Sequence, residues 1–195
     1  ALSGLHHHLI RKGTRSKVSI IVESAEPREV HHLAALLGFG AVAINPYLAF
    51  ESLRGLIEIG DIHETEVDKA INTYILTATD GIVKVLSKMG ISTIQSYIGA
   101  QIFEAIGIDQ GVIEKYFTDT ASRMEVIGLG IIAEEVMMRH KRAFDPTRGG
   151  ERTLDSGDDF QWRHDGEDHQ YNPRTIHLLQ HACRTNNYKL FKEYS

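Results

Sequence analysis

The stretch that decides the fold is SKMGISTIQSYIGAQIFEA, residues 87–105. It places a short β-type segment, residues 91–94, between a long helical pattern and a second predicted helix. Gly90 allows close approach to the backbone at this junction, and hydroxyl and amide side chains crowd around it. Backbone amides and small hydroxyls in such a place are typical of flavin and phosphate sites. A helix that ends in a glycine cap beside a packed strand has the same pattern, so both interpretations stay open.

Upstream of this stretch, strand and helix patterns alternate. Residues 17–24 and 41–44 are nearly continuous apolar runs, which predict two buried strands. Helical patterns follow them over residues 28–37 and 48–53. This order predicts a parallel α/β layer with a right-handed crossover. Residues 64–88 then form a longer helical pattern with one apolar side.

Downstream, the spacing predicts short helices over residues 101–106 and 109–117 and a longer helix over residues 121–140. Residues 145–175 show little periodicity and predict an irregular excursion, and a final helix is expected over residues 175–183. Three strands are few for a self-contained parallel sheet. The chain is therefore expected to be dominated by helices or to be cut from something larger.

Composition narrows the function classes. The 195 residues are 42% hydrophobic, enough to bury a core, and the net charge of −5 gives no general field for nucleic acid. No apolar run is long enough for a membrane span, so neither nucleic acid nor membrane is an expected partner. The single cysteine, Cys183, fits a reducing cytoplasm. It also excludes an iron–sulfur cluster held by several cysteines of this chain alone.

Histidines and strand ends supply the first candidate sites. Adjacent histidines of a helix, as in residues 6–8 and 31–32, point in different directions, so we expect ordinary helix histidines and no metal site. His6 and His7 are also candidates for a contact with another domain. Residues 23–26 and 45–47, which include Glu23 and Asn45, lie at the C-terminal ends of the two predicted strands. Parallel sheets bind ligands there, although turn and cap residues have the same pattern.

Three further groups have a functional and an ordinary interpretation. Arg123, near the start of the predicted helix 121–140, would hold an anion, but residues 118–120 would serve equally as helix caps. Acidic residues at 158–168 suggest calcium, but their spacing is wrong for an EF-hand loop. Trp162 is expected to anchor packing or an interface.

Several ordered blocks of sequence resemble one family. The blocks are HHHLIR (residues 6–11), VES (22–24), REVHH (28–32), AINPYLA (43–49), SKMGISTIQSYIGAQIFEA (87–105), YFT (116–118), QWR (161–163) and LQHA (179–182). Because they run over nearly the whole chain, the sequence resembles the large (alpha) subunit of glutamate synthases. The resemblance implies a fragment of a longer polypeptide.

The resemblance implies a junction between two domains. Residues 1–60 would end the central domain, and residues 61–195 would begin the FMN-binding (β/α)8 domain, including a long irregular insertion. Residues 89–93 would form the first barrel strand. The implied fold class is therefore a helix-rich α/β fold with a short parallel sheet and an incomplete (β/α) barrel portion.

The resemblance also implies an activity for the parent enzyme. Such enzymes transfer the amide nitrogen of glutamine to 2-oxoglutarate and reduce the product to glutamate, using FMN and a 3Fe–4S cluster. Ferredoxin or an NAD(P)H-oxidising beta subunit donates the electrons. The implied partners are therefore that donor, the two substrates and the remainder of the alpha subunit.

The resemblance places site residues as well. Met89, Gly90, Ile91 and Ser92 would lie against FMN, whereas Gln101 and Glu104 would face 2-oxoglutarate. If it is buried, Glu104 has the raised pKa of an acid or base, whereas in solvent it is an ordinary surface residue.

Departures from the family pattern limit what this chain does alone. Asp119 stands where the family has glycine and Ile98 where arginine is common, and the cysteines for the cluster are missing. We expect the isolated chain to be inactive. The alternative is a stand-alone α/β ligand-binding or protein-interaction module from the same ancestor. Open strand edges make a homo-oligomer plausible in either case.

Overall fold

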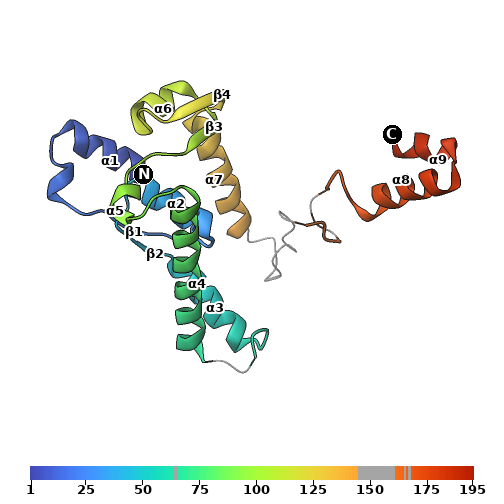
Figure 1. The fold of residues 1–195 in the computed structure, drawn as a ribbon, viewed down its shortest axis with the longest axis horizontal. Helices are drawn as coiled ribbons and strands as arrows, with labels where there is room; N and C mark the ends of the chain where they lie inside the picture. The colour runs from blue at the N-terminus through green and yellow to red at the C-terminus, as the bar shows by residue number, and fades with distance from the viewer. Residues whose placement is uncertain (64–65, 145–160, 165, 167) are drawn as a thin grey trace. The chain divides into compact units, whose positions relative to one another are not determined.

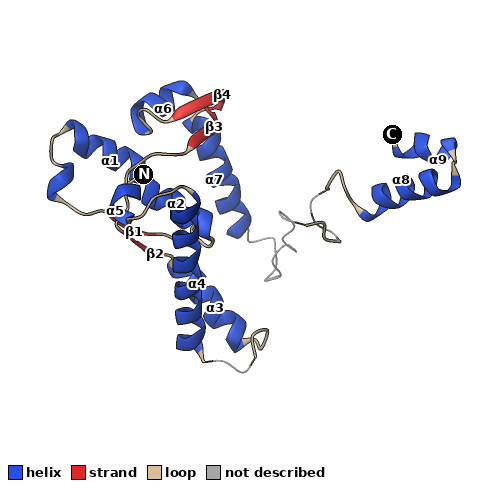
Figure 2. Cartoon of the chain, viewed as in Figure 1, coloured by secondary structure: helices blue, strands red, loops and turns tan. Residues whose placement is uncertain are grey.

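A computed structural model describes residues 1–63, 66–144, 161–164, 166 and 168–195. The chain divides into two compact units, Ala1–His140 and Lys141–Ser195. Figure 2 shows that helices dominate and that the strands are short. The predicted class, helix-rich α/β with short parallel pairing, is confirmed.

The first unit opens with helix α1 (Leu2–Arg11) and then builds one parallel strand pair. The pair joins β1 (Ile21–Glu23) to β2 (Ala43–Asn45), with Val22 opposite Ile44, and helix α2 (Val30–Gly38) makes the connection between them. A 3-10 turn, η1 (Arg15–Lys17), precedes β1, and helix α3 (Tyr47–Glu58) follows β2. The predicted strand–helix–strand–helix order is confirmed, but the expected burial of the strands is wrong, since Ile21 of β1 is 71% exposed.

A long helix, α4 (Val67–Lys88), packs on this layer and closes its core. It contacts both α2 and α3 (Figure 1). Three fully or nearly buried side chains form the centre of the core: Ala34 of α2, Leu86 of α4 and Tyr97. Phe103 packs against this centre and stacks on Phe39 with ring centroids 5.7 Å apart. The stretch 87–105 therefore supplies part of the core as well as the candidate site.

The expected strand at residues 91–94 is wrong. Residues 91–93 pair with no strand among the described residues, and a four-residue helix, α5 (Ile94–Tyr97), begins directly after them. Thr93 takes extended geometry at the start of that helix, and its Oγ1 lies 2.9 Å from Ser96 Oγ. Residues 91–93 are thus an extended segment that leads into a helical turn, because no neighbouring strand pairs with their backbone.

A second parallel pair replaces two expected helices. Strand β3 (Glu104–Ile108) overlaps the helix expected over residues 101–106, and β4 (Ala121–Ile127) takes the first part of the one expected over 121–140. Helix α6 (Gln110–Tyr116) connects them as predicted, and α7 (Leu129–Ala143) follows Gly128. Apolar runs this short fit the periodicity of a helix and that of a strand equally well. The backbone pairing between the two segments makes them strands.

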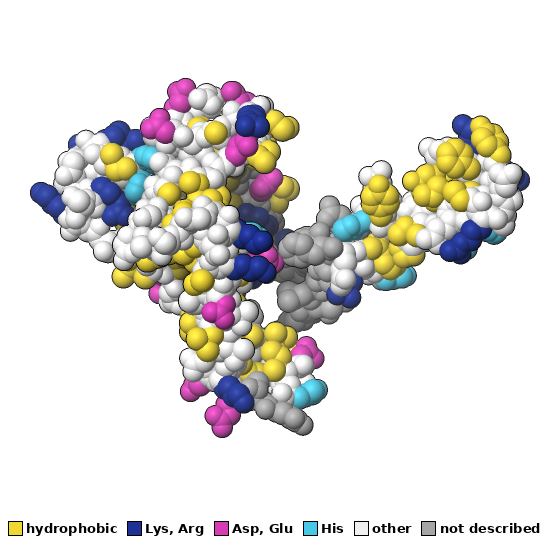
Figure 3. All heavy atoms as spheres, in the orientation of Figure 1, with side chains coloured by type: hydrophobic (Ala, Val, Ile, Leu, Met, Phe, Trp, Pro, Cys, Tyr) yellow, Lys and Arg dark blue, Asp and Glu magenta, His cyan; other side chains and the backbone are white. Residues whose placement is uncertain are grey.

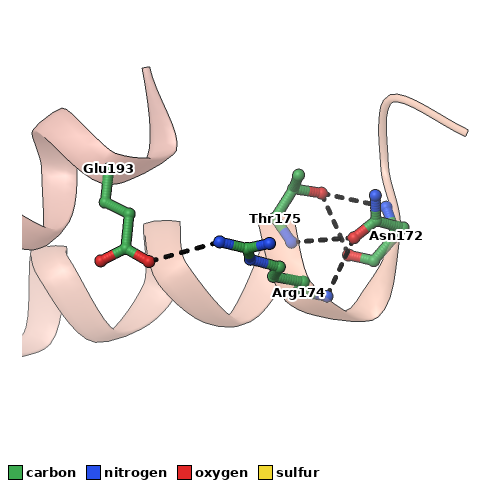
Figure 4. A network of polar contacts seen from close by, with 4 residues as sticks. All are labelled: Asn172, Arg174, Thr175 and Glu193. Atoms are coloured by element: carbon green, nitrogen blue, oxygen red, sulfur yellow. Dashed lines mark hydrogen bonds and ion pairs between the residues drawn. The ribbon is translucent and has the colours of Figure 1, made fainter.

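The second unit contains a helical hairpin. Helix α8 (Pro173–Thr185) was predicted, whereas α9 (Tyr188–Tyr194) was not. Figure 4 shows Asn172 at the start of α8, where its side chain accepts hydrogen bonds from the amides of Arg174 and Thr175, both at 3.0 Å. Arg174 also reaches Glu193 of α9 at 3.5 Å.

Most of the predicted irregular excursion, residues 145–160 together with 165 and 167, lies outside the described residues. The acidic positions 158, 159, 165 and 167 of the calcium hypothesis are among them. Trp162 is partly exposed and its ring lies 6.3 Å from that of His164. Within the described ranges, no helix is both long and apolar enough to cross a bilayer.

Candidate functional site

The turn after α4 holds the four residues expected to contact a flavin. Gly90 has φ +68°, and the Ile91 amide donates back to the Leu86 carbonyl at 2.9 Å. The Gly90 amide donates to Ser87 O at 3.2 Å, and the Met89 amide donates to Val85 O at 3.1 Å. This is a glycine helix cap that satisfies the carbonyls at the end of α4. The amides of residues 89–91 are therefore committed to the helix, contrary to the expectation that they face a ligand.

A hollow of about 550 Å³ lies over this turn. It is lined by Val83, Leu86, Ser87, Gly90, Ile91, Ser92 and Ile94. A Cβ built on Gly90 would meet nothing within 4 Å, so space remains directly above the backbone. The lining is mostly apolar and includes two serines, whereas Met89 is 44% exposed and is not part of it. Figure 3 shows hydrophobic side chains reaching the surface of this first unit in several places, so an apolar wall open to solvent is not unusual for it.

Gln101 lies apart from this lining and has a left-handed backbone, with φ +52°. The backbone N–H of Gln101 donates to Gly38 O at 3.1 Å, which holds this part of the chain against the end of α2. Its side-chain Nε2 lies 2.7 Å from Nε2 of His7 and 3.2 Å from the carbonyl oxygen of Thr118. The side chain thus joins α1 to the loop before β4.

Glu104 opens β3, and its carboxylate lies 3.3 Å from Nε of Arg123 on the neighbouring strand β4. The Glu104 side chain is 36% exposed, so it is an ion-paired group at the surface of the sheet. Because Arg123 lies in a strand, the expected anion site at a helix N-terminus is wrong, and so is the alternative of a helix cap at residues 118–120.

The adjacent histidines of α1 are buried, with 8% of His6 and 6% of His7 exposed. His6 Nδ1 accepts from Arg15 Nε at 3.0 Å, and the same guanidinium donates to Gly40 O at 2.8 Å. Burial and the neighbouring Arg15 charge lower the pKa of His6. The expectation of ordinary, satisfied helix histidines is confirmed, but the linkage of His7 to Gln101 was not predicted.

At the β1–β2 edge, Glu23 and Asn45 lie at the carboxyl ends of the two strands, as expected. Glu23 and Asn45 are in register, and Asn45 Nδ2 donates to Glu23 Oε2 at 2.9 Å. Ser24 Oγ accepts from the Glu26 amide, as a turn residue does. The two polar groups therefore satisfy each other at the carboxyl end of the pair.

Comparison with known proteins gives a consistent pattern. A family model described as the glutamate synthase central domain matches residues 1–109. The chain is 56% identical over its full length to the NADPH glutamate synthase large chain of Bacillus subtilis. It is 43% identical over its full length to the NADH glutamate synthase of Schizosaccharomyces pombe. Over 99% of its length, it is 37% identical to the ferredoxin-dependent glutamate synthase of Cyanidium caldarium. It spans 13%, 9% and 13% of those three relatives.

Proposed function

The chain belongs to the glutamate synthase family, and on that premise we propose that it contributes part of the flavin site of a glutamate synthase large chain. In this proposal, residues 1–60 belong to the central domain and residues 61–195 to the FMN-binding domain. The central-domain match extends to residue 109, past this proposed boundary, so the hollow at Gly90 lies in the part of the chain that the central-domain model matches. That hollow is the observation that carries the proposal.

The parent reaction joins the amide nitrogen of glutamine to 2-oxoglutarate and reduces the product to glutamate. Bound FMN would supply the reducing equivalents, which reach it through a 3Fe–4S cluster whose cysteine ligands are not in these 195 residues. The relatives carry NADPH, NADH and ferredoxin in their names, so the proposed electron donor is one of these or a subunit that oxidises them.

The residues at the turn fit the ring of a flavin better than its phosphate. Ile91, Ile94 and Val83 give an apolar wall, and Gly90 leaves room for a planar group close to the backbone. Ser92 offers a hydroxyl at the rim. Because the amides of residues 89–91 are used by the helix cap, an anionic phosphate would find few donors here.

Flavin content tests the proposal. Full-length large chain carrying Gly90→Val is expected to lose FMN, since the branched side chain fills the space above the turn, and Ser92→Ala is expected to weaken binding. Ser52→Ala, a change on the exposed side of α3, serves as the control. Unchanged flavin absorbance in Gly90→Val would refute the proposed site.

The isolated 195-residue chain is proposed to be inactive. Its test is glutamate formation from 2-oxoglutarate with glutamine or ammonia and a chemical reductant. Turnover by this chain alone would refute the view that it acts only as part of the larger protein, and would favour an autonomous module.

A further inference from the structure

Helix α1 and the segment after α5 meet through one side-chain pair. His7 and Gln101 are 94 residues apart in sequence, yet their Nε2 atoms lie 2.7 Å apart. His7 is buried, and Gln101 is half-buried. The contact therefore joins distant parts of the first unit at a protected place.

The geometry fixes which way the Gln101 amide points. The Thr118 carbonyl oxygen can only accept, so the Gln101 atom 3.2 Å from it must be the amide nitrogen. One hydrogen of that nitrogen then goes to Thr118 and the other to His7. Nε2 of His7 must accept, which requires a neutral ring with its proton on Nδ1. The side-chain oxygen of Gln101, Oε1, is then the atom that remains available to accept a hydrogen bond from a ligand.

The backbone of Gln101 supports a functional role. Its φ of +52° is uncommon for a residue with a side chain, and such strained residues cluster at functional sites. The bond from its backbone amide to Gly38 O holds this conformation. Gln101 is thus fixed at both its backbone and its side chain.

We propose that His7 is a positioning residue that orients Gln101, so that Gln101 presents an acceptor oxygen to the substrate. The proposal rests on the proposed function, and it takes from the family resemblance the expectation that Gln101 faces 2-oxoglutarate. An acceptor oxygen suits a group that donates a hydrogen, such as an amine or imine N–H, and repels a carboxylate. Gln101 would therefore recognise the nitrogen of the reacting species and not a carboxyl group of the oxo acid.

The pair is sensitive to acid, because a protonated His7 can no longer accept from Gln101. His7 faces His6 and Arg11 of its own helix and Asp119 of the loop before β4. Burial and the Arg11 charge lower the pKa of His7, whereas the Asp119 carboxylate opposes that shift. The neutral form is therefore favoured near neutral pH.

The test compares three variants of the full-length large chain: His7→Ala, His7→Gln and His6→Ala. With the nitrogen donor and 2-oxoglutarate varied in turn, kcat and KM are measured across pH for each variant, together with its FMN content. His7→Ala is expected to lower kcat/KM about tenfold or more through a misplaced Gln101. His7→Gln keeps an acceptor oxygen and is expected to restore most of that loss. It is also expected to remove the acid limb of the pH profile.

His6→Ala is the matched control, since His6 is equally buried on the same helix but bonds Arg15 and not Gln101. It is expected to lower thermal stability while leaving kcat/KM within about twofold of wild type. An equal loss in His6→Ala, no rescue by His7→Gln, or full activity in His7→Ala would overturn the positioning role. A wild-type protein that forms no glutamate would instead refute the proposed function itself.

Discussion

The clearest structural perturbation is Gly40→Ala. Gly40 lies between α2 and β2 with φ +105°, and a Cβ built there would clash with Nδ1 of His6. The His6 ring has little room to move, because Arg15 donates to that same nitrogen and also to the Gly40 carbonyl. The substitution thus meets two separate obstacles, one in the backbone and one in the packing.

The magnitude follows from adding those obstacles. A side chain at strongly positive φ costs about 1–2 kcal/mol, and overpacking a filled site costs about 1–3 kcal/mol. We therefore expect Gly40→Ala to lower the free energy of unfolding by about 2–5 kcal/mol. The matched control is Gly90→Ala, at φ +68° with open space around its Cβ, where only the backbone cost of about 1–2 kcal/mol applies.

Urea denaturation followed by far-ultraviolet circular dichroism measures both variants. A difference between them of less than about 0.5 kcal/mol would refute the reasoning, because it would mean that the His6 ring moves aside freely. Adding His6→Ala to Gly40→Ala separates the two costs. Measured against His6→Ala alone, the added Gly40→Ala change should cost only the backbone part, about 1–2 kcal/mol, because the packing part is gone.

Three further predictions concern charge and capping. The pKa values of His6 and His7 are lowered in the folded state, so the unfolded chain binds more protons as the pH falls. The free energy of unfolding, measured by urea titration, should therefore be at its full value above about pH 6.5 and decrease below it. A free energy that does not change with pH would contradict this. Asn172→Ala should cost about 1 kcal/mol and reduce the helicity of α8, measured by urea titration and circular dichroism, since two amides lose their acceptor. Arg123→Gln should cost less than about 1 kcal/mol, since 84% of the Arg123 side chain is exposed; a larger loss by urea titration would indicate a structural role for its pair with Glu104.

The first strand pair could be predicted because the apolar runs and the residues that end the helix between them indicate the same structure. Residues 20–22 and 41–44 are apolar runs, and proline and glycine mark the ends of the helix between them. The second pair could not. Both faces of β4 are largely exposed, Met124 and Val126 on one face and Arg123 and Glu125 on the other, so burial imposes no two-residue alternation on the sequence.

The candidate site divides in the same way. The glycine cap at the end of α4 could be predicted from the helical pattern and Gly90 alone, as could the place of Glu23 and Asn45 at the ends of their strands. The hydrogen bond between these two side chains was not predicted. The bond between His7 and Gln101 could not, because it depends on an unusual backbone at residue 101 and on a contact across 94 positions. One available signal was the pattern of α1, in which Ser3, His6 and His7 occupy positions that a buried face would fill.

That long separation has a consequence during synthesis. A ribosome adds about 5–20 residues per second, so helix α1 leaves the ribosome about 5–20 s before Gln101 does. Throughout that interval the buried side of α1 has no Gln101 to bind and is accessible to other nascent chains. Ribosomes that follow one another on the same message expose the same helix side by side. Helix α1 thus waits for a partner that is made 94 residues later, and the speed of translation sets how long it waits.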